Sequence, residues 1–92
     1  MTMLASVKKA LRASSSSFDD EVMELIEAAK LDLKIAGIKV SDSPDALIKR
    51  AITIYCKAHF GYDNPEADRF RDSYVMLKQH LSLAGDYREP LE

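Results

Sequence analysis

The chain has 92 residues, of which 47% are hydrophobic and 30% are charged, and its formal net charge is −2. This length suits one domain, and the composition is that of a folded chain rather than a disordered one. The slight acidic excess gives no overall attraction to nucleic acid or to an anionic membrane, because both usually require an excess of basic residues.

The first predicted helix covers residues 3–12. Apolar residues recur along it at helical spacing: Leu4, Val7 and Leu11. The other side of this helix is basic and carries Lys8, Lys9 and Arg12. Its basic last turn complements the negative end of the helix dipole. The serine-rich residues 13–17 then predict a break, because serine side chains favour turns and caps over helix interiors.

The second predicted helix covers residues 19–36. Asp19 is the expected N-cap, with Phe18 and Met23 at the positions of a hydrophobic staple, and Gly37 is the expected stop. This helix also carries an acidic series: Asp20, Glu24 and Glu27.

The third predicted helix covers residues 44–60. It begins at Ser43-Pro44, because proline is well tolerated in the first turn, and it stops at Gly61. Its apolar surface is broad, which is typical of a central helix contacted on more than one side. The alternative is that part of this surface is exposed in the monomer and covered by a partner.

The fourth predicted helix covers residues 65–84 and begins at Asn64-Pro65. Its apolar residues follow a heptad-like seam: Ala67, Phe70, Tyr74, Leu77 and Leu81. This seam suits packing along the third helix. Residues 85–92 are predicted to be a polar, mobile tail. The sequence therefore predicts a single all-α domain, a bundle of about four helices with short loops.

No catalytic, metal-binding or cofactor-binding pattern is found in the sequence. The three glycines are isolated, His59 and His80 stand alone, and Cys56 lies in an apolar run without a second cysteine. We expect Cys56 to be a small buried hydrophobic residue in a reducing compartment. The protein is predicted not to be an enzyme and to need no cofactor.

No apolar run approaches the roughly 20 residues that span a bilayer, and no signal-peptide pattern opens the chain. We therefore expect a soluble protein of the cell interior. A DNA-reading helix-turn-helix is disfavoured, because the third helix starts with Pro44-Asp45-Ala46-Leu47, which is acidic and apolar where base and phosphate contacts would be needed. The basic residues Lys49, Arg50 and Lys57 lie further along that helix.

Interaction is the remaining class of function. The sequence has more large apolar residues near its termini and predicted loops than a single small bundle is expected to cover. They are Phe18, Ile38, Phe60, Tyr62, Met76, Tyr87 and Leu91. A basic first helix followed by an acidic second helix suits complementary contacts between copies, although two solvated helix faces would have the same pattern.

The order of segments resembles a family, the head-to-tail connector (adaptor or head-completion) proteins of tailed bacteriophages. The resemblance runs through the opening Leu4-x-x-Val7-Lys8-x-x-Leu11-Arg12, the Asp19-Asp20 helix start and the Leu25–Lys30 segment. It is closest over Leu47–Ile52 with Tyr55 and His59–Gly61, and it continues through Phe70, Tyr74, Leu77 and Leu81. It covers about residues 3–87. The Asp63-Asn64-Pro65 turn is shorter than the loops of many members.

The resemblance implies a ring of copies at the head-tail junction of the virion, made in the host cytoplasm from a phage or prophage gene. The implied partners are further copies of the chain, the portal protein and a tail-completion or head-closure protein, with no membrane and no sequence-specific nucleic acid. Candidate residues between subunits are Lys8, Lys9, Arg12, Asp20, Glu24 and Glu27. Candidate docking residues for the other partners are Tyr62, Tyr87 and Leu91. The alternative is a small DNA-binding or regulatory helical interaction protein.

Overall fold

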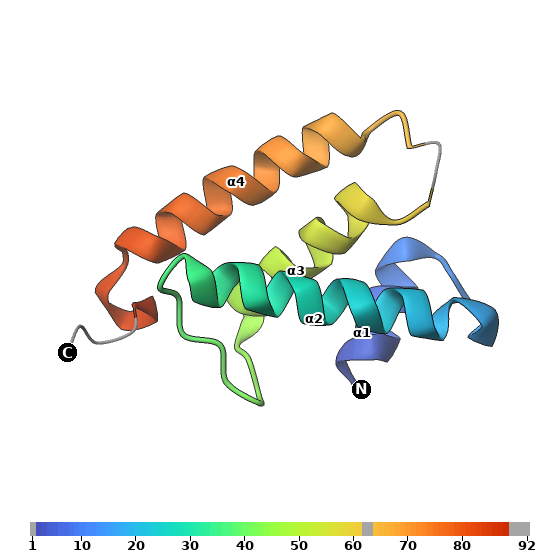
Figure 1. The fold of residues 1–92 in the computed structure, drawn as a ribbon, viewed down its shortest axis with the longest axis horizontal. Coiled ribbons are helices and arrows are strands. Elements are labelled where there is room, and N and C mark those ends of the chain that lie inside the picture. The colour runs from blue at the N-terminus through green and yellow to red at the C-terminus, as the bar shows by residue number, and fades with distance from the viewer. Residues whose placement is uncertain (1, 62–63, 89–92) are drawn as a thin grey trace.

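Four α-helices make up the fold of the computed structural model, which describes residues 2–61 and 64–88 (Figure 1). They are α1 (Met3–Leu11), α2 (Asp19–Ile35), α3 (Ala46–His59) and α4 (Ala67–Leu83). The short 3-10 helix η1 (Ser16–Phe18) precedes α2, and a second one, η2 (Gly85–Tyr87), follows α4. Within the described residues no strand is formed, and the only β pairing is an isolated bridge between Ile38 and Arg88. The predicted all-α bundle of four helices is confirmed.

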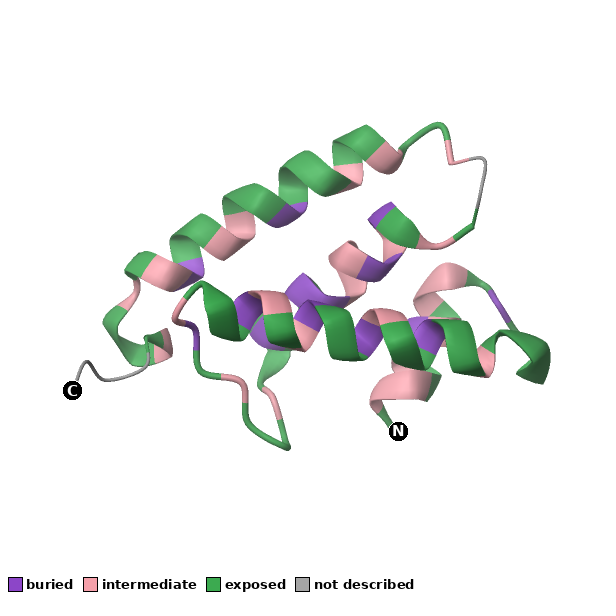
Figure 2. Ribbon diagram, viewed as in Figure 1, coloured by how far each residue is buried: buried purple, intermediate pink, exposed green. Residues whose placement is uncertain are grey.

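The central element is α3, which packs against α1, α2 and α4. In Figure 2 the buried residues concentrate on α3 and in a stripe along α2, whereas most of α4 is exposed. The predicted seam of α4 lies against α3, with Tyr74 and Leu81 buried. The largest side chains that are fully buried come from all of the first three helices and from the loop after α2: Val7, Val22, Ile26, Leu33, Ile38, Ile52 and Cys56.

The first two helices differ from the prediction at their ends. Arg12 is not part of α1 but its C-cap, and its φ of 59° makes it the one described non-glycine residue in the left-handed region. The predicted N-cap Asp19 is instead the first residue of α2, because η1 runs directly into that helix. The ring of Phe18 packs edge-on against Phe60 at 5.4 Å. Gly37, with a φ of 83°, does take the left-handed conformation after α2.

The two later helices begin two residues after the predicted starts. The N-cap of α3 is Asp45, whose carboxylate accepts hydrogen bonds from the amides of Leu47 and Ile48 at 3.1 Å. The first amides of a helix have no acceptor within the helix, and the Asp45 carboxylate supplies one. The helix therefore starts after Asp45 and not at the predicted Pro44. Before α4, the side chain of Asn64 accepts from the amide of Glu66 and donates to the carbonyl of Lys57.

Of the predicted mobile tail, residues 85–88 form η2 and its C-cap Arg88, and residues 89–92 lie outside the described residues. After η2 the chain lies beside the loop that follows α2, and the amide of Lys39 donates to the carbonyl of Tyr87 at 2.7 Å. The hydroxyl of Tyr87 donates to the Asp45 carboxylate, also at 2.7 Å. The prediction of a mobile tail did not include these contacts, because no periodic sequence pattern indicates them. None of the described helices is long and apolar enough to cross a membrane.

Candidate interaction surfaces

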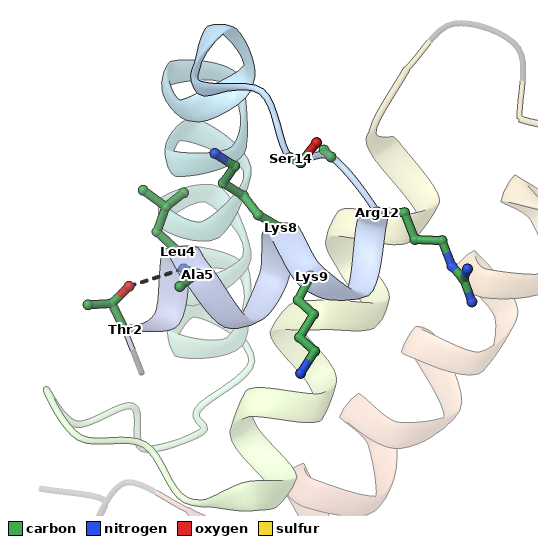
Figure 3. A pocket seen from close by; sticks show the side chains of 8 residues that line it. Thr2, Leu4, Ala5, Lys8, Lys9, Arg12 and Ser14 are labelled. Carbon is green, nitrogen blue, oxygen red and sulfur yellow. Dashed lines mark hydrogen bonds between the residues drawn. The ribbon is translucent and has the colours of Figure 1, made fainter.

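A shallow depression on the outer side of α1 contains three of the predicted interface residues. We call it the α1 surface, and Figure 3 shows the side chains that line it. They are Thr2, Leu4, Ala5, Lys8, Lys9, Arg12, Ala13 and Ser14. Thr2 caps α1 by accepting a hydrogen bond from the amide of Ala5 at 3.1 Å. The depression therefore has a rigid helical floor with cationic side chains around it.

The three cations of the α1 surface leave the helix in different directions (Figure 3). Lys8 reaches α2 within the same chain and forms an ion pair with Asp19 at 2.5 Å, with 17% of its side chain exposed. Lys9 and Arg12 are exposed and have no ion-pair partner among the described residues. Lys9 and Arg12 are therefore available to another molecule, whereas Lys8 joins α1 to α2.

The predicted acidic residues lie on one exposed stripe of α2. Asp20, Glu24 and Glu27 follow each other at steps of four and three, and Leu31 and Ile35 continue the same stripe at steps of four. We call these five residues the outer stripe of α2. Leu31 and Ile35 are 60% and 79% exposed, although both are large aliphatic side chains. The outer stripe is thus acidic in its first half and apolar in its second.

The C-terminal ends of α2 and α4 lie at the same end of the molecule, beside η2 (Figure 1). Each ends in a strongly exposed aliphatic residue, Ile35 on α2 and Leu83 on α4, which is 81% exposed. On α4, Met76 is also exposed, one heptad before Leu83. Exposed apolar residues so placed on regular helices are typical of surfaces that another protein covers.

A polar cluster joins α4 to α2. The hydroxyl of Tyr74 donates to the Asp32 carboxylate at 2.5 Å, and Lys78 donates to the same oxygen at 3.0 Å. Burial alone would raise the pKa of Asp32, but the hydrogen bonds from Tyr74 and Lys78 outweigh it, so the pKa is lowered. Burial and the adjacent carboxylate raise the pKa of Tyr74. The cluster therefore holds a carboxylate and a neutral phenol.

Of the predicted docking residues, only Tyr87 lies within the described part of the chain. It is half-buried, and its hydroxyl is engaged by Asp45. Tyr62 and Leu91 lie outside the described residues. Ile38 and Phe60, which we expected among the uncovered apolar residues, are fully buried and half-buried respectively.

The cysteine and the potential metal ligands of the described residues form no site at these surfaces. Cys56 is fully buried, and burial raises the pKa of its thiol to about 12, so that it remains protonated and unreactive near neutral pH. Over residues 2–61 and 64–88, no three His, Cys, Asp or Glu side chains form a group that could hold a metal ion.

Sequence reasoning missed two features of these surfaces. The Asp32 cluster depends on residues more than forty positions apart, so no local pattern indicates it. The apolar half of the outer stripe was detectable, because Leu31 and Ile35 continue the spacing of the acidic residues.

Charged and apolar residues exposed on a regular helical bundle are typical of proteins that contact other proteins. A family model described as phage connector protein matches residues 3–88, nearly the whole chain. The chain belongs to this phage connector family. No curated protein and no solved structure matches it significantly.

Proposed function

We propose that this chain is the repeating subunit of a ring that joins the portal of a DNA-filled phage head to the tail. Membership of the connector family supports a place between head and tail. A ring requires that one face of each subunit meets a different face of the next. The outer stripe of α2 and the α1 surface are two unlike faces of this kind.

The observation that carries the proposal is the separation of opposite charges onto different helices. Lys9 and Arg12 extend from α1 without an ion-pair partner among the described residues. Asp20, Glu24 and Glu27 line the outside of α2, where Glu27 also pairs with Lys30 at 3.4 Å. Contact between α1 of one copy and α2 of the next pairs these charges. Burial of the apolar second half of the outer stripe adds affinity to this contact, whereas the charges mainly fix the orientation of the two copies.

The remaining partners are proposed to dock at the end of the bundle where α2, α4 and η2 meet. Ile35 and Leu83 expose aliphatic surface there, and Tyr87 lies in the adjoining η2. The portal and a tail-completion or head-closure protein are the proposed occupants, with Tyr62 and Leu91 as further candidate contacts. Assembly in the host cytoplasm and a final place at the head-tail junction of the virion follow from this role.

Charge reversal tests the contact between subunits. We expect Lys9→Glu combined with Arg12→Glu to raise the concentration needed for self-association about tenfold or more, because the reversed charges face the acidic stripe. Adding Asp20→Lys and Glu24→Lys to the same chain should restore association. Size-exclusion chromatography with light scattering over a concentration series measures both effects.

The matched control reverses two charges elsewhere. Arg69→Glu combined with Arg71→Glu changes the net charge equally. It breaks two exposed ion pairs at the start of α4, which contribute little to stability, and the contact of Arg69 with the Phe70 ring. This control should associate like the unmodified protein. Equal association of the α1 variant and the control would contradict the proposed pairing of α1 with α2.

A further inference from the structure

A second basic surface lies between α3 and α4, separate from the α1 surface. Eight residues line this groove, which we call the α3–α4 groove: Ala46, Lys49, Arg50, Thr53, Ile54, Lys57, Phe70 and Ser73. Its floor is a side of α3 that carries three cations over about two turns. Lys49 and Arg50 are exposed, and Lys57 is half-buried against the ring of Phe70 at 5.4 Å.

The positive charge of this groove is not neutralised within the described chain. None of its eight lining residues is acidic, and none of Lys49, Arg50 and Lys57 forms an ion pair with a described residue. The adjoining hollow, which Lys57 also lines, contains one acid, Glu66, and Glu66 is paired with Arg69 at 2.6 Å. The chain has a net charge of −2, yet this groove is locally cationic because many of the acids lie on the outside of α2.

The groove continues toward α1. A smaller hollow is lined by Ala10 and Leu11 of α1 together with Lys57, Phe60, Asn64, Glu66 and Phe70. Lys57 and Phe70 line both hollows, so the two adjoin each other at these residues. Lys9 and Arg12 flank Ala10 and Leu11 in the sequence but line the separate α1 surface.

The side chains of the groove match those that contact nucleic-acid phosphates. Lysine, arginine, serine and threonine make most phosphate contacts, and the groove provides Lys49, Arg50, Lys57, Thr53 and Ser73. Protein interfaces are instead depleted in lysine and serine and rich in exposed aromatic anchors. The one aromatic ring here, Phe70, is already covered by the cations of Lys57 and Arg69.

We propose that the α3–α4 groove binds the phosphate backbone of DNA without reading the bases. From Lys49 to Lys57 the helix rises by about 12 Å, which corresponds to three or four phosphates of one strand. The groove lining has no asparagine or glutamine for bidentate contacts to adenine, and we assign Lys49, Arg50 and Lys57 to phosphates. This contact is made by a single subunit, so it does not depend on ring formation.

Binding is measured by fluorescence anisotropy with a labelled duplex of about 30 base pairs, in two unrelated sequences and over a series of salt concentrations. Three phosphate contacts predict an affinity that falls on the order of 40-fold between about 50 and 200 mM salt, equally for both sequences. Lys49→Glu combined with Lys57→Glu should lower the affinity at least about tenfold and reduce the salt slope by about two.

The control variant is Lys34→Glu combined with Lys39→Glu, which gives the same change of net charge at two exposed lysines outside the groove. It should keep the salt slope of the unmodified protein. If Lys57→Glu disturbs folding, as judged by circular dichroism, Lys49→Glu combined with Arg50→Glu removes the same charge and leaves the Lys57–Phe70 contact intact. Absence of binding at low salt, or equal losses in groove and control variants, would overturn the proposal. A groove variant that loses self-association but keeps DNA affinity would overturn it in favour of an acidic surface of another copy.

Discussion

Replacing Ile52 with alanine is expected to lower the free energy of unfolding by about 3 to 4 kcal/mol. Ile52 is fully buried, and it lies in the middle of α3, the helix that contacts each of the other three. Truncation removes the transfer energy of the lost methyl and methylene groups and leaves a cavity that surrounding helices fill only partly. A domain of this size has roughly 5 to 14 kcal/mol of total stability, so the loss is a large share of it.

Urea denaturation followed by circular dichroism measures this effect as a lower midpoint with an unchanged slope. The control is Ile35→Ala on α2, the same substitution at a side chain that is 79% exposed, and its effect should stay within about 0.5 kcal/mol. Similar losses for both variants would contradict the placement of α3 at the centre of the bundle.

Replacing Asp32 with alanine is expected to cost about 1 to 2 kcal/mol, because the hydroxyl of the buried Tyr74 then loses its acceptor. We expect the loss of stability to lie in the lower part of this range, because 37% of the Asp32 side chain is exposed and water can partly replace its carboxylate as the acceptor. Tyr74→Phe removes the other side of the hydrogen bond. In a double-mutant cycle, the two substitutions together should cost less than the sum of the single changes.

The same cluster gives a pH dependence with a defined sign. The pKa of Asp32 is lower in the folded protein than in the unfolded chain, so its contribution is complete above the unfolded value of about 3.9. That contribution is lost as the pH falls through the folded pKa. Urea midpoints measured between about pH 6 and pH 3 should therefore fall less steeply for Asp32→Asn than for the unmodified protein. Parallel pH profiles would contradict a lowered pKa at Asp32.

Helix number, order and packing partners could be predicted because each helix carries its own apolar periodicity. The breadth of the apolar surface on α3 correctly indicated the central helix, and the seam of α4 indicated its partner. Helix ends were less predictable, because they depend on which of several neighbouring caps forms. Ser43 and Asp45 are both suitable N-caps, and only the structure shows that Asp45 bonds the first amides of α3.

The exposure of the candidate interface residues was predictable in part, and their role between subunits stays a prediction. Charge patterns alone identified Lys9, Arg12 and the acidic residues of α2 as candidates, and the structure places all of them on the exposed outside of the bundle. The ion pair of Lys8 with Asp19 and the docking of η2 onto the loop after α2 depend on the tertiary arrangement. The α3–α4 groove was not predicted, although the packing of α4 along α3 and the basic residues of α3 were, because the side of α3 that stays open beside α4 depends on the tertiary arrangement.

Negative-stain electron microscopy of the concentrated protein, alone and mixed with its portal protein, tests the assembly role most directly. The proposed head-to-tail contact predicts closed ring-shaped particles with one constant number of subunits, which disappear when Lys9 and Arg12 are reversed to glutamate. Single copies at about millimolar concentration, with no ring on the portal either, would contradict it.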